Sequence, residues 1–94
     1  MSAYVIVDIT VHDPERYETY KSMAAPTVQQ YDGRYIVRGG RAEQLEGEGS
    51  PQRVVVLEFP DFERAKEWWN SPEYAPAKEL RHDTASSEMF LVEG

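Results

Sequence analysis

The sequence predicts a single α+β domain, residues 1–94, in which helices cover one side of an antiparallel sheet. Four short segments rich in β-branched and aromatic residues are typical of strands. Two longer segments between them have apolar residues at three-to-four spacing and begin with helix start signals. With 94 residues, 40% of them hydrophobic, the chain can form one core but not two.

The first strand is expected at residues 3–11 and is followed by a helix start. Asp13 can accept backbone N–H groups, and Pro14 suits the first helical position. The helix is expected to reach about Tyr31, with a kink or break near residues 24–25 because Pro26 lacks an amide hydrogen. Gly33 is expected to end this segment with a positive φ.

A second strand is expected at residues 34–38 and a third at residues 53–59. The polar, acidic and glycine-rich residues 41–52 between them predict a loop or an irregular hairpin arm. This loop would serve as a lid over a pocket, as an arm that grips a second subunit, or as plain surface.

Asp61 is expected to cap a helix with Trp68 on its inward face. Ser71 followed by Pro72 repeats the start signal and predicts a further helix at residues 72–83. The last strand is expected at residues 87–93.

The resulting order, strand-helix-strand-strand-helix-strand, is the ferredoxin-like βαββαβ arrangement with a four-stranded antiparallel sheet. Its first and third strands lie in the centre, and the second strand flanks the third. The alternation of side chains then predicts that Asp8, Arg34, Arg38 and Glu58 project from the face away from the helices.

The strands are apolar on both faces, although helices cover only one face of such a sheet. Val5, Val7 and Ile9 alternate with Tyr4 and Ile6 in the first strand, and the third strand repeats this pattern. The second apolar face therefore needs a cover of its own, and we expect a homodimer in which two sheets enclose a common barrel.

Composition excludes several classes of function. The net charge of −7 disfavours nucleic acid and anionic membranes as partners, and the longest aliphatic run is too short to span a bilayer. There is no cysteine, and His12 and His82 lack metal-site spacing, so we expect neither a metal nor another cofactor. No secretion signal is recognisable, so a cytoplasmic location is expected.

Arg38 and Glu58 are the predicted catalytic residues. A charge on an interface-facing strand is costly unless it is paired, so its presence needs an explanation. In the functional interpretation Arg38 holds a carboxylate or enolate and Glu58 moves a proton. In the structural interpretation both belong to ion pairs or to the rim of the barrel.

Tyr20, Trp68 and Arg81 are the predicted substrate-binding residues. Tyr20 and Trp68 lie on two helices that can face one cleft, where aromatic walls commonly line a pocket. Arg81 lies at the edge of an inward helix face and can close a pocket, or it can place its stem on the core and reach water. The possible ligand is a small carboxylate-bearing molecule.

The chain resembles the domain-of-unknown-function 1330 family of the dimeric α+β barrel superfamily over nearly its whole length. The resemblance is carried by Asp13, Tyr17, Tyr20, Gly33-Arg34, Arg38-Gly39-Gly40, Glu46-Gly47, Arg53, Glu58-Phe59-Pro60, Ala65, Trp68, Asn70 to Tyr74 and Arg81. It departs from the family at Asp32, which is usually glycine, and at Trp69, which is usually tyrosine.

The resemblance implies a homodimer whose two sheets pack face to face, and it implies no settled activity. Superfamily relatives include monooxygenases, haem-degrading proteins and lactone isomerases. Two functions therefore stay open: a cofactor-independent enzyme, or a non-catalytic binding or assembly module in which the charged residues are dimer ion pairs.

Overall fold

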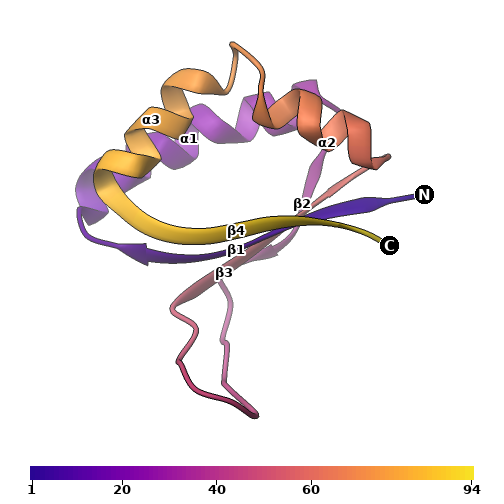
Figure 1. Cartoon of the computed structure of the whole chain (residues 1–94). Coiled ribbons are helices and arrows are strands. Elements are labelled where there is room, and N and C mark those ends of the chain that lie inside the picture. The colour runs from indigo at the N-terminus through magenta and orange to yellow at the C-terminus, as the bar shows by residue number, and fades with distance from the viewer.

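The protein folds into one four-stranded antiparallel sheet with three helices on one of its faces (Figure 1). This computed structural model describes all residues, 1–94. The strands are β1 (Ala3–Val11), β2 (Arg34–Arg38), β3 (Arg53–Phe59) and β4 (Ala85–Glu93), and the helices are α1 (Pro14–Gln30), α2 (Phe62–Trp69) and α3 (Ala75–Thr84). The sheet order β2-β3-β1-β4 confirms the predicted topology.

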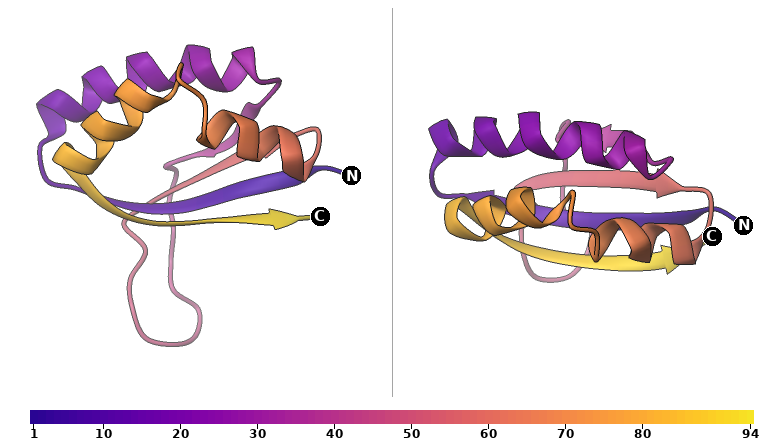
Figure 2. Two further views of the ribbon diagram at one scale, coloured as in Figure 1. Left: turned by 45° about the horizontal axis from the view of Figure 1, so that its top comes forward. Right: turned by 90° about the horizontal axis from the view of Figure 1, so that it is seen from above.

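The helices form one layer, which encloses the core against the sheet. Viewed from above, α1 runs along one side of the layer, and α3 and α2 follow each other along the other side (Figure 2). The alternate residues of β1 and β3 that face this layer are buried, and so are aromatic residues of the helices. The buried residues of β1 and β3 are those that the alternation predicts: Val5, Val7, Ile9, Val55, Leu57 and Phe59.

The sequence predicted a kink or a break in α1, and the structure shows no break: the helix runs without interruption through Pro26. Proline inside a helix costs about 3 kcal/mol, since it removes one hydrogen bond and crowds the preceding turn. On either side of Pro26 the helix buries Ala24, Thr27 and Val28 against the core. This burial offsets the local cost and keeps the helix continuous.

The turn from α1 to β2 differs from the expectation at Gly33. The positive φ, +66°, belongs to Asp32. Gly33 is needed for space instead, because a Cβ atom there would lie 2.6 Å from the Phe59 ring and 2.9 Å from a Val28 methyl group. The chain therefore passes close to the core at this residue.

The third helix begins three residues later than predicted, at Ala75. Ser71 still acts at this start, because its Oγ accepts a hydrogen bond of 3.1 Å from the Tyr74 backbone N–H. The last strand begins at Ala85, directly after α3, two residues before the predicted start.

The face of the sheet away from the helices is uncovered and largely apolar. Phe90 is 59% exposed there, and Val37 and Val92 are also exposed. Tyr4, Ile6, Val54 and Val56 lie between them and are half-buried by their neighbours.

The segment between β2 and β3 projects from the sheet on this uncovered side (Figures 1 and 2). Its base is tied to β1, since the Gln52 backbone N–H donates to Asp8 Oδ1 at 3.0 Å. Leu45 is 91% exposed. None of the three helices is long and apolar enough to cross a membrane.

Candidate functional site

The structure places Arg38 and Glu58 on opposite faces of the sheet. A bulge in β2 between Tyr35 and Val37 adds one residue to the strand. Each later side chain of β2 therefore points to the opposite face of the sheet from the one that regular alternation predicts. Arg38 thus pairs with buried Val55 and faces the helix layer. Its predicted position beside Glu58 is wrong for this reason.

Glu58 lies on the uncovered face, as predicted, and pairs there with Arg34. Arg34 Nε and Nη2 both lie 2.6 Å from Glu58 Oε1. This guanidinium holds the pKa of Glu58 below its usual value, and hydrogen bonds from Tyr4 and Ser2 act in the same direction. Asp8 shares this face, opposite Glu88 and Val54.

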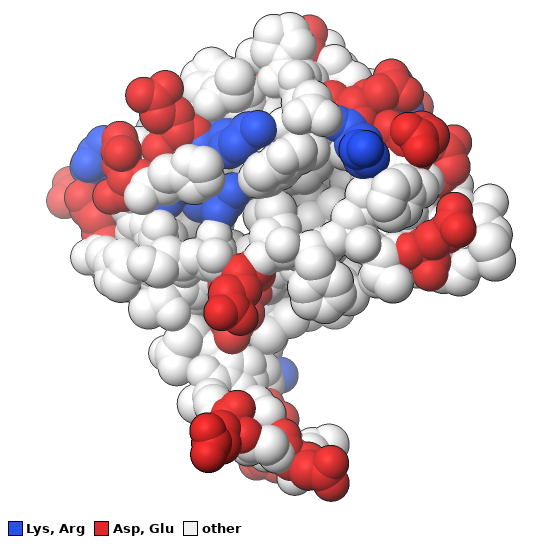
Figure 3. Space-filling view, in the orientation of Figure 1, with Lys and Arg blue, Asp and Glu red and all other residues white.

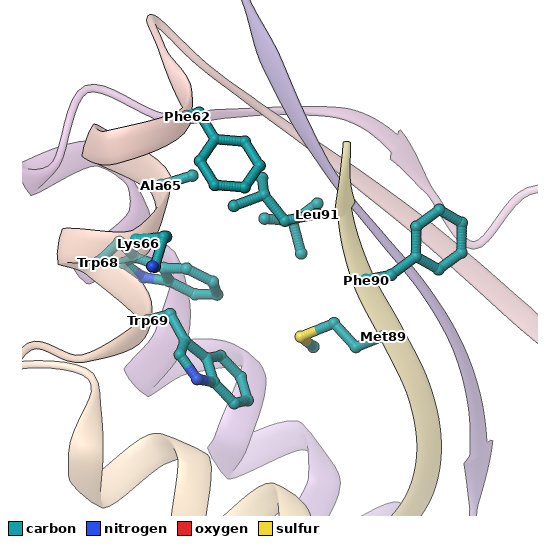
Figure 4. A pocket seen from close by; sticks show the side chains of 9 residues that line it. Phe62, Ala65, Lys66, Trp68, Trp69, Met89, Phe90 and Leu91 are labelled. Carbon is teal, nitrogen blue, oxygen red and sulfur yellow. The ribbon is translucent and has the colours of Figure 1, made fainter. Parts of the chain in front are cut away.

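An apolar cleft of about 370 Å³ lies between α2 and β4 (Figure 4). Eight of its nine lining residues are hydrophobic: Val5, Phe62, Ala65, Trp68, Trp69, Met89, Phe90 and Leu91. Lys66 on α2 is the one charged residue of the lining. Of these residues only Trp68 was predicted from the sequence to belong to a site, although the alternation in β4 places Met89 and Leu91 on the helix side.

Trp68 is a fixed wall of this cleft. Its indole Nε1 donates to Thr27 Oγ1 at 3.1 Å, and Thr27 Oγ1 donates to the Ala24 carbonyl at 2.7 Å. The ring packs on Tyr74, with the ring centroids 4.1 Å apart. Helix α2 is therefore joined to α1 by a side chain that has little freedom to rotate.

Arg81 lies beside the same cleft and is only 2% exposed. Its guanidinium carbon is 5.9 Å from the Trp69 ring centroid. Nη1 donates to the hydroxyl of Ser87, which precedes Met89 by two residues and faces the same side of β4. None of the ion pairs in the structure includes Arg81.

Tyr74 and Tyr20 extend the polar contacts of Arg81 into the core. Arg81 Nε donates to the Tyr74 hydroxyl at 3.4 Å, and this hydroxyl lies 3.0 Å from that of Tyr20. Burial raises the pKa of Tyr20, and Tyr74 raises it further, so the Tyr20 phenol stays protonated. The Arg81 Nε–H and the two phenolic O–H groups thus have only the two phenolic oxygens as acceptors. One phenolic proton is therefore left without an acceptor.

A second, smaller cavity of about 30 Å³ lies on the other side of Trp68 and Met89, which line both cavities. Tyr20 and Tyr35 line it, together with Arg38 and Arg53. The structure thus brings the predicted residues Tyr20, Trp68 and Arg81 together, and it places Arg38 at this second cavity.

The space between helices and sheet is cationic, although the chain has a net charge of −7. Ten lysine and arginine residues are present, and four of them form ion pairs with carboxylates: Arg16, Lys21, Arg34 and Arg64. Of the remaining six, Lys66 lines the first cavity, Arg38 and Arg53 line the second, and Lys78 and Arg81 lie against Trp69, which is a wall of the first cavity. No carboxylate lines either cavity.

Lys78 lies against Trp69, a wall of the cleft. Its Nζ lies 4.0 Å from the Trp69 ring centroid and donates to the Trp69 carbonyl at 2.7 Å. Burial lowers the pKa of Lys78, and the Arg81 charge lowers it further. Figure 3 shows Lys and Arg groups on both sides of a hollow in the surface above β4, while Asp and Glu groups lie farther out.

This arrangement suits binding and polarisation of an anion. Apolar walls exclude water, which strengthens the interaction of a guanidinium with negative charge. Neutral phenols next to it can donate hydrogen bonds. No three His, Asp or Glu side chains are grouped so that they could hold a metal ion.

Solved structures with the same fold span almost the whole chain. A protein of unknown function from Rhodopseudomonas palustris is 17% identical, with a TM-score of 0.80, over 99% of this chain and 82% of that one. A dimeric ferredoxin-like protein of unknown function from Jannaschia sp. CCS1 is 12% identical, with a TM-score of 0.76, over 100% of both chains.

SnoaB, a cofactor-independent oxygenase from Streptomyces nogalater, is 17% identical, with a TM-score of 0.66, over 99% of this chain and 92% of that one. At these identities the likeness establishes the ferredoxin-like fold. No functionally curated protein matches the sequence. The sequence model of the domain of unknown function DUF1330 matches residues 2–94, so the chain belongs to that family.

Proposed function

We propose that this protein binds a small organic anion in the cleft between α2 and β4, and that it acts on this molecule as a cofactor-independent enzyme. Arg81 holds the anionic group, and the apolar body of the ligand lies between Trp69 and the β4 residues Met89 and Leu91. The observation that carries the proposal is the buried Arg81 guanidinium, which has no carboxylate partner.

The cost of burying this charge supports a ligand. Taking an ion out of water costs several kcal/mol even after the protein relaxes. Arg81 lies in the last turn of α3, where the helix dipole offsets about 0.3–1 kcal/mol. Its two side-chain acceptors, Tyr74 and Ser87, are neutral hydroxyls. A bound carboxylate supplies the compensating charge and accepts two parallel hydrogen bonds from a guanidinium.

The shape and lining of the cleft define the ligand further. A volume of about 370 Å³ lies in the range of small-molecule pockets, and the lining is almost wholly apolar. Trp68 and Trp69 offer flat surfaces for a ring or a conjugated chain. The ligand class is therefore a small carboxylate with a flat apolar body.

The catalytic part of the proposal rests on Arg81 and the two phenols. A guanidinium and a phenolic O–H stabilise charge that develops on a substrate oxygen, such as the oxygen of an enolate. SnoaB, which shares this fold, is a cofactor-independent oxygenase. Glu58 receives no role in proton transfer here, because it lies on the opposite face of the sheet.

The placement of Glu58 also favours a second candidate function. Without that carboxylate, the cleft is lined by apolar residues and Lys66, and none of its lining residues is an obvious general base. The same site would then serve a non-catalytic binding protein, which retains an organic acid without changing it.

Naphthalene-1-carboxylate and naphthalene-1-carboxamide make a matched pair of probes for the site. They share an apolar body and differ in charge. We expect the carboxylate to quench tryptophan fluorescence saturably and to bind more tightly than the carboxamide. A hydrogen bond to a charged group contributes about 1.5–3 kcal/mol, which corresponds to about tenfold or more in the dissociation constant.

Arg81→Gln should remove this preference, while binding of the carboxamide stays unchanged. Arg64→Gln is the control, because Arg64 already pairs with Asp32 and Glu67 on the surface. If Arg81→Gln fails to fold, Arg81→Lys keeps the charge but loses the forked geometry and should bind more weakly. Equal binding of both probes by the native protein would refute the anion site. Turnover of a bound carboxylate without added cofactor separates the enzyme from the binding protein.

We also propose that two copies of the chain pair through the uncovered face of the sheet. The exposed apolar residues of that face support a partner sheet, and two neighbouring structures of the same fold are dimeric. In this pairing the two helix layers lie on the outside, and Phe90, which lines part of the cleft, lies at the interface.

A further inference from the structure

We propose that Arg53 and Arg38 form a second anion-binding site at the small cavity beneath α1, which takes one oxyanion group, such as a carboxylate or a phosphate. This site is separate from the α2–β4 cleft of the proposed function. Three observations carry it: a buried Arg53 Nε without an acceptor, two guanidinium groups on one face without a carboxylate, and a spare phenolic proton next to them.

Arg53 is held in place by the surrounding chain. Its guanidinium lies across Gly39, where a Cβ atom would be only 2.7 Å from Arg53 Cζ. Gly39 has a φ of +77° and is fixed to β3, because its N–H donates to the Val54 carbonyl at 2.8 Å. The guanidinium carbon is also 5.9 Å from the Tyr17 ring centroid. The side chain is thus ordered before any ligand arrives, which lowers the entropic cost of binding.

Arg53 Nε is the one fully buried side-chain nitrogen or oxygen that lacks a hydrogen-bond partner in the protein. An unpaired donor of this kind costs about 1–3 kcal/mol if it belongs to a charged or polar group in the interior. Buried donors in folded proteins nearly always have a partner, so a group from outside the chain is expected here.

Arg38 supplies the second positive charge. It pairs with Val55 in the register of the sheet, so it lies diagonal to Arg53 on the same face. Its guanidinium carbon stacks over the Tyr35 ring at 4.3 Å from the centroid. Neither arginine forms an ion pair with a carboxylate of the chain. Two like charges at this spacing repel each other unless an anion lies between them.

Tyr20 and the size of the cavity define what can enter. Tyr20 lines the cavity, and its pair with Tyr74 leaves one phenolic proton without an acceptor. The volume of about 30 Å³ admits roughly one water-sized group, so one oxygen of the anion enters while the rest stays at the mouth. Lys21 lines the same mouth but already pairs with Glu18 at 2.9 Å.

The arginine Nε–H signals of the protein in nuclear magnetic resonance spectra report on this site directly. On titration with inorganic phosphate, and separately with acetate, we expect the Arg53 Nε–H signal to shift downfield and to saturate. The Arg64 signal serves as a control, because Arg64 Nε already donates to Asp32 at 3.1 Å. A response to phosphate alone or to acetate alone identifies which oxyanion the site prefers.

Arg38→Gln should weaken this binding by about tenfold or more, since it removes one charged donor. Arg53→Lys keeps the charge and a long side chain but removes Nε, so it should weaken binding even where Arg53→Gln fails to fold. The proposal is overturned if the Arg53 signal shifts without saturation, or if it shifts no more than that of Arg64. The Arg53 signal will behave in this way if the partner of Arg53 Nε is only an ordered water molecule.

The two sites can fail independently. Arg81→Gln should leave the phosphate response of Arg53 unchanged, because Trp68 and Met89 separate the two cavities. Arg38→Gln should likewise leave the naphthalene-1-carboxylate titration unchanged. Loss of both responses in either variant would show that there is one shared site, and this would contradict the separate second site.

Discussion

At the scale of single residues, Gly33 and Arg81 both shape the helix side of the sheet. Gly33 lets the chain pass close to Phe59 and Val28. Arg81 places a charge in the core without a carboxylate partner. Both residues could be singled out from the sequence, but the reason for each depends on neighbours that are distant in the chain.

Gly33→Ala is expected to destabilise the protein by about 1–3 kcal/mol, because the new methyl group overpacks the core. It would lie 2.6 Å from the Phe59 ring, which is itself buried in the core. Gly40→Ala is the matched control, since nothing lies within 4 Å of a side chain there. Urea denaturation of both variants measures the difference. Equal stability of the two would show that the packing around Gly33 is looser than described.

Tyr20→Phe is expected to change how stability depends on pH. Burial, and then Tyr74, raise the pKa of Tyr20 in the folded protein. As the pH rises above the ordinary tyrosine value of about 10, the unfolded chain loses this proton while the folded chain keeps it. The free energy of unfolding therefore falls with rising pH, and its full value is present only below about pH 10.

In Tyr20→Phe this fall should be shallower by about 1.4 kcal/mol per pH unit, after a loss of about 0.5–1.5 kcal/mol at neutral pH. Tyr17→Phe is the control, because Tyr17 is also buried and its hydroxyl makes no hydrogen bond. Chemical denaturation from about pH 9 to about pH 11 measures both slopes. Parallel curves for Tyr20→Phe and the native protein would contradict the raised pKa.

At the scale of secondary-structure elements, the sequence predicted the strands and helices better than it predicted their irregularities. Alternation identified the inward residues of β1 and β3, and capping signals at Asp13 and Asp61 located two helix starts. The β2 bulge was not predictable, because it depends on how β2 pairs with β3. That one extra residue turned Arg38 toward the helices and separated it from Glu58.

Pro26→Ala is expected to stabilise the protein by up to about 3 kcal/mol. It restores a helical N–H in the interior of α1, and the exposed proline ring contributes little packing. Pro76→Ala is the control, because Pro76 lies in the first turn of α3, where an N–H has no partner within the helix. Melting temperatures of the two variants test this expectation. A loss of stability in Pro26→Ala would mean that the proline fixes a bend that the core requires.

At the scale of the whole molecule, the second apolar face of the sheet was the most informative feature of the sequence. The structure leaves this face uncovered in the single chain, with Phe90 59% exposed. The β2–β3 loop projects on the same side (Figure 1), so within one chain it does not cover the α2–β4 cleft. The cleft itself was not predictable, because its walls come from α2 and β4 together.

Phe90→Glu is expected to weaken the proposed dimer, because it places a negative charge on the apolar face that forms the interface, next to Glu88. Sedimentation over a range of concentrations should show a dimer for the native protein and a folded monomer for the variant. Glu79→Lys on the exposed part of α3 is a suitable control, since it also alters charge but lies in the outer layer. A native protein that stays monomeric at all concentrations would contradict the pairing.

The central claim is that Arg81 recognises the anionic group of an apolar ligand in the α2–β4 cleft. A crystal structure of the complex with naphthalene-1-carboxylate tests this most directly. We predict both carboxylate oxygens within hydrogen-bonding distance of the Arg81 guanidinium, with the ring system between Trp69 and Met89. A carboxylate bound elsewhere, with Arg81 still contacting only Tyr74 and Ser87, would contradict it.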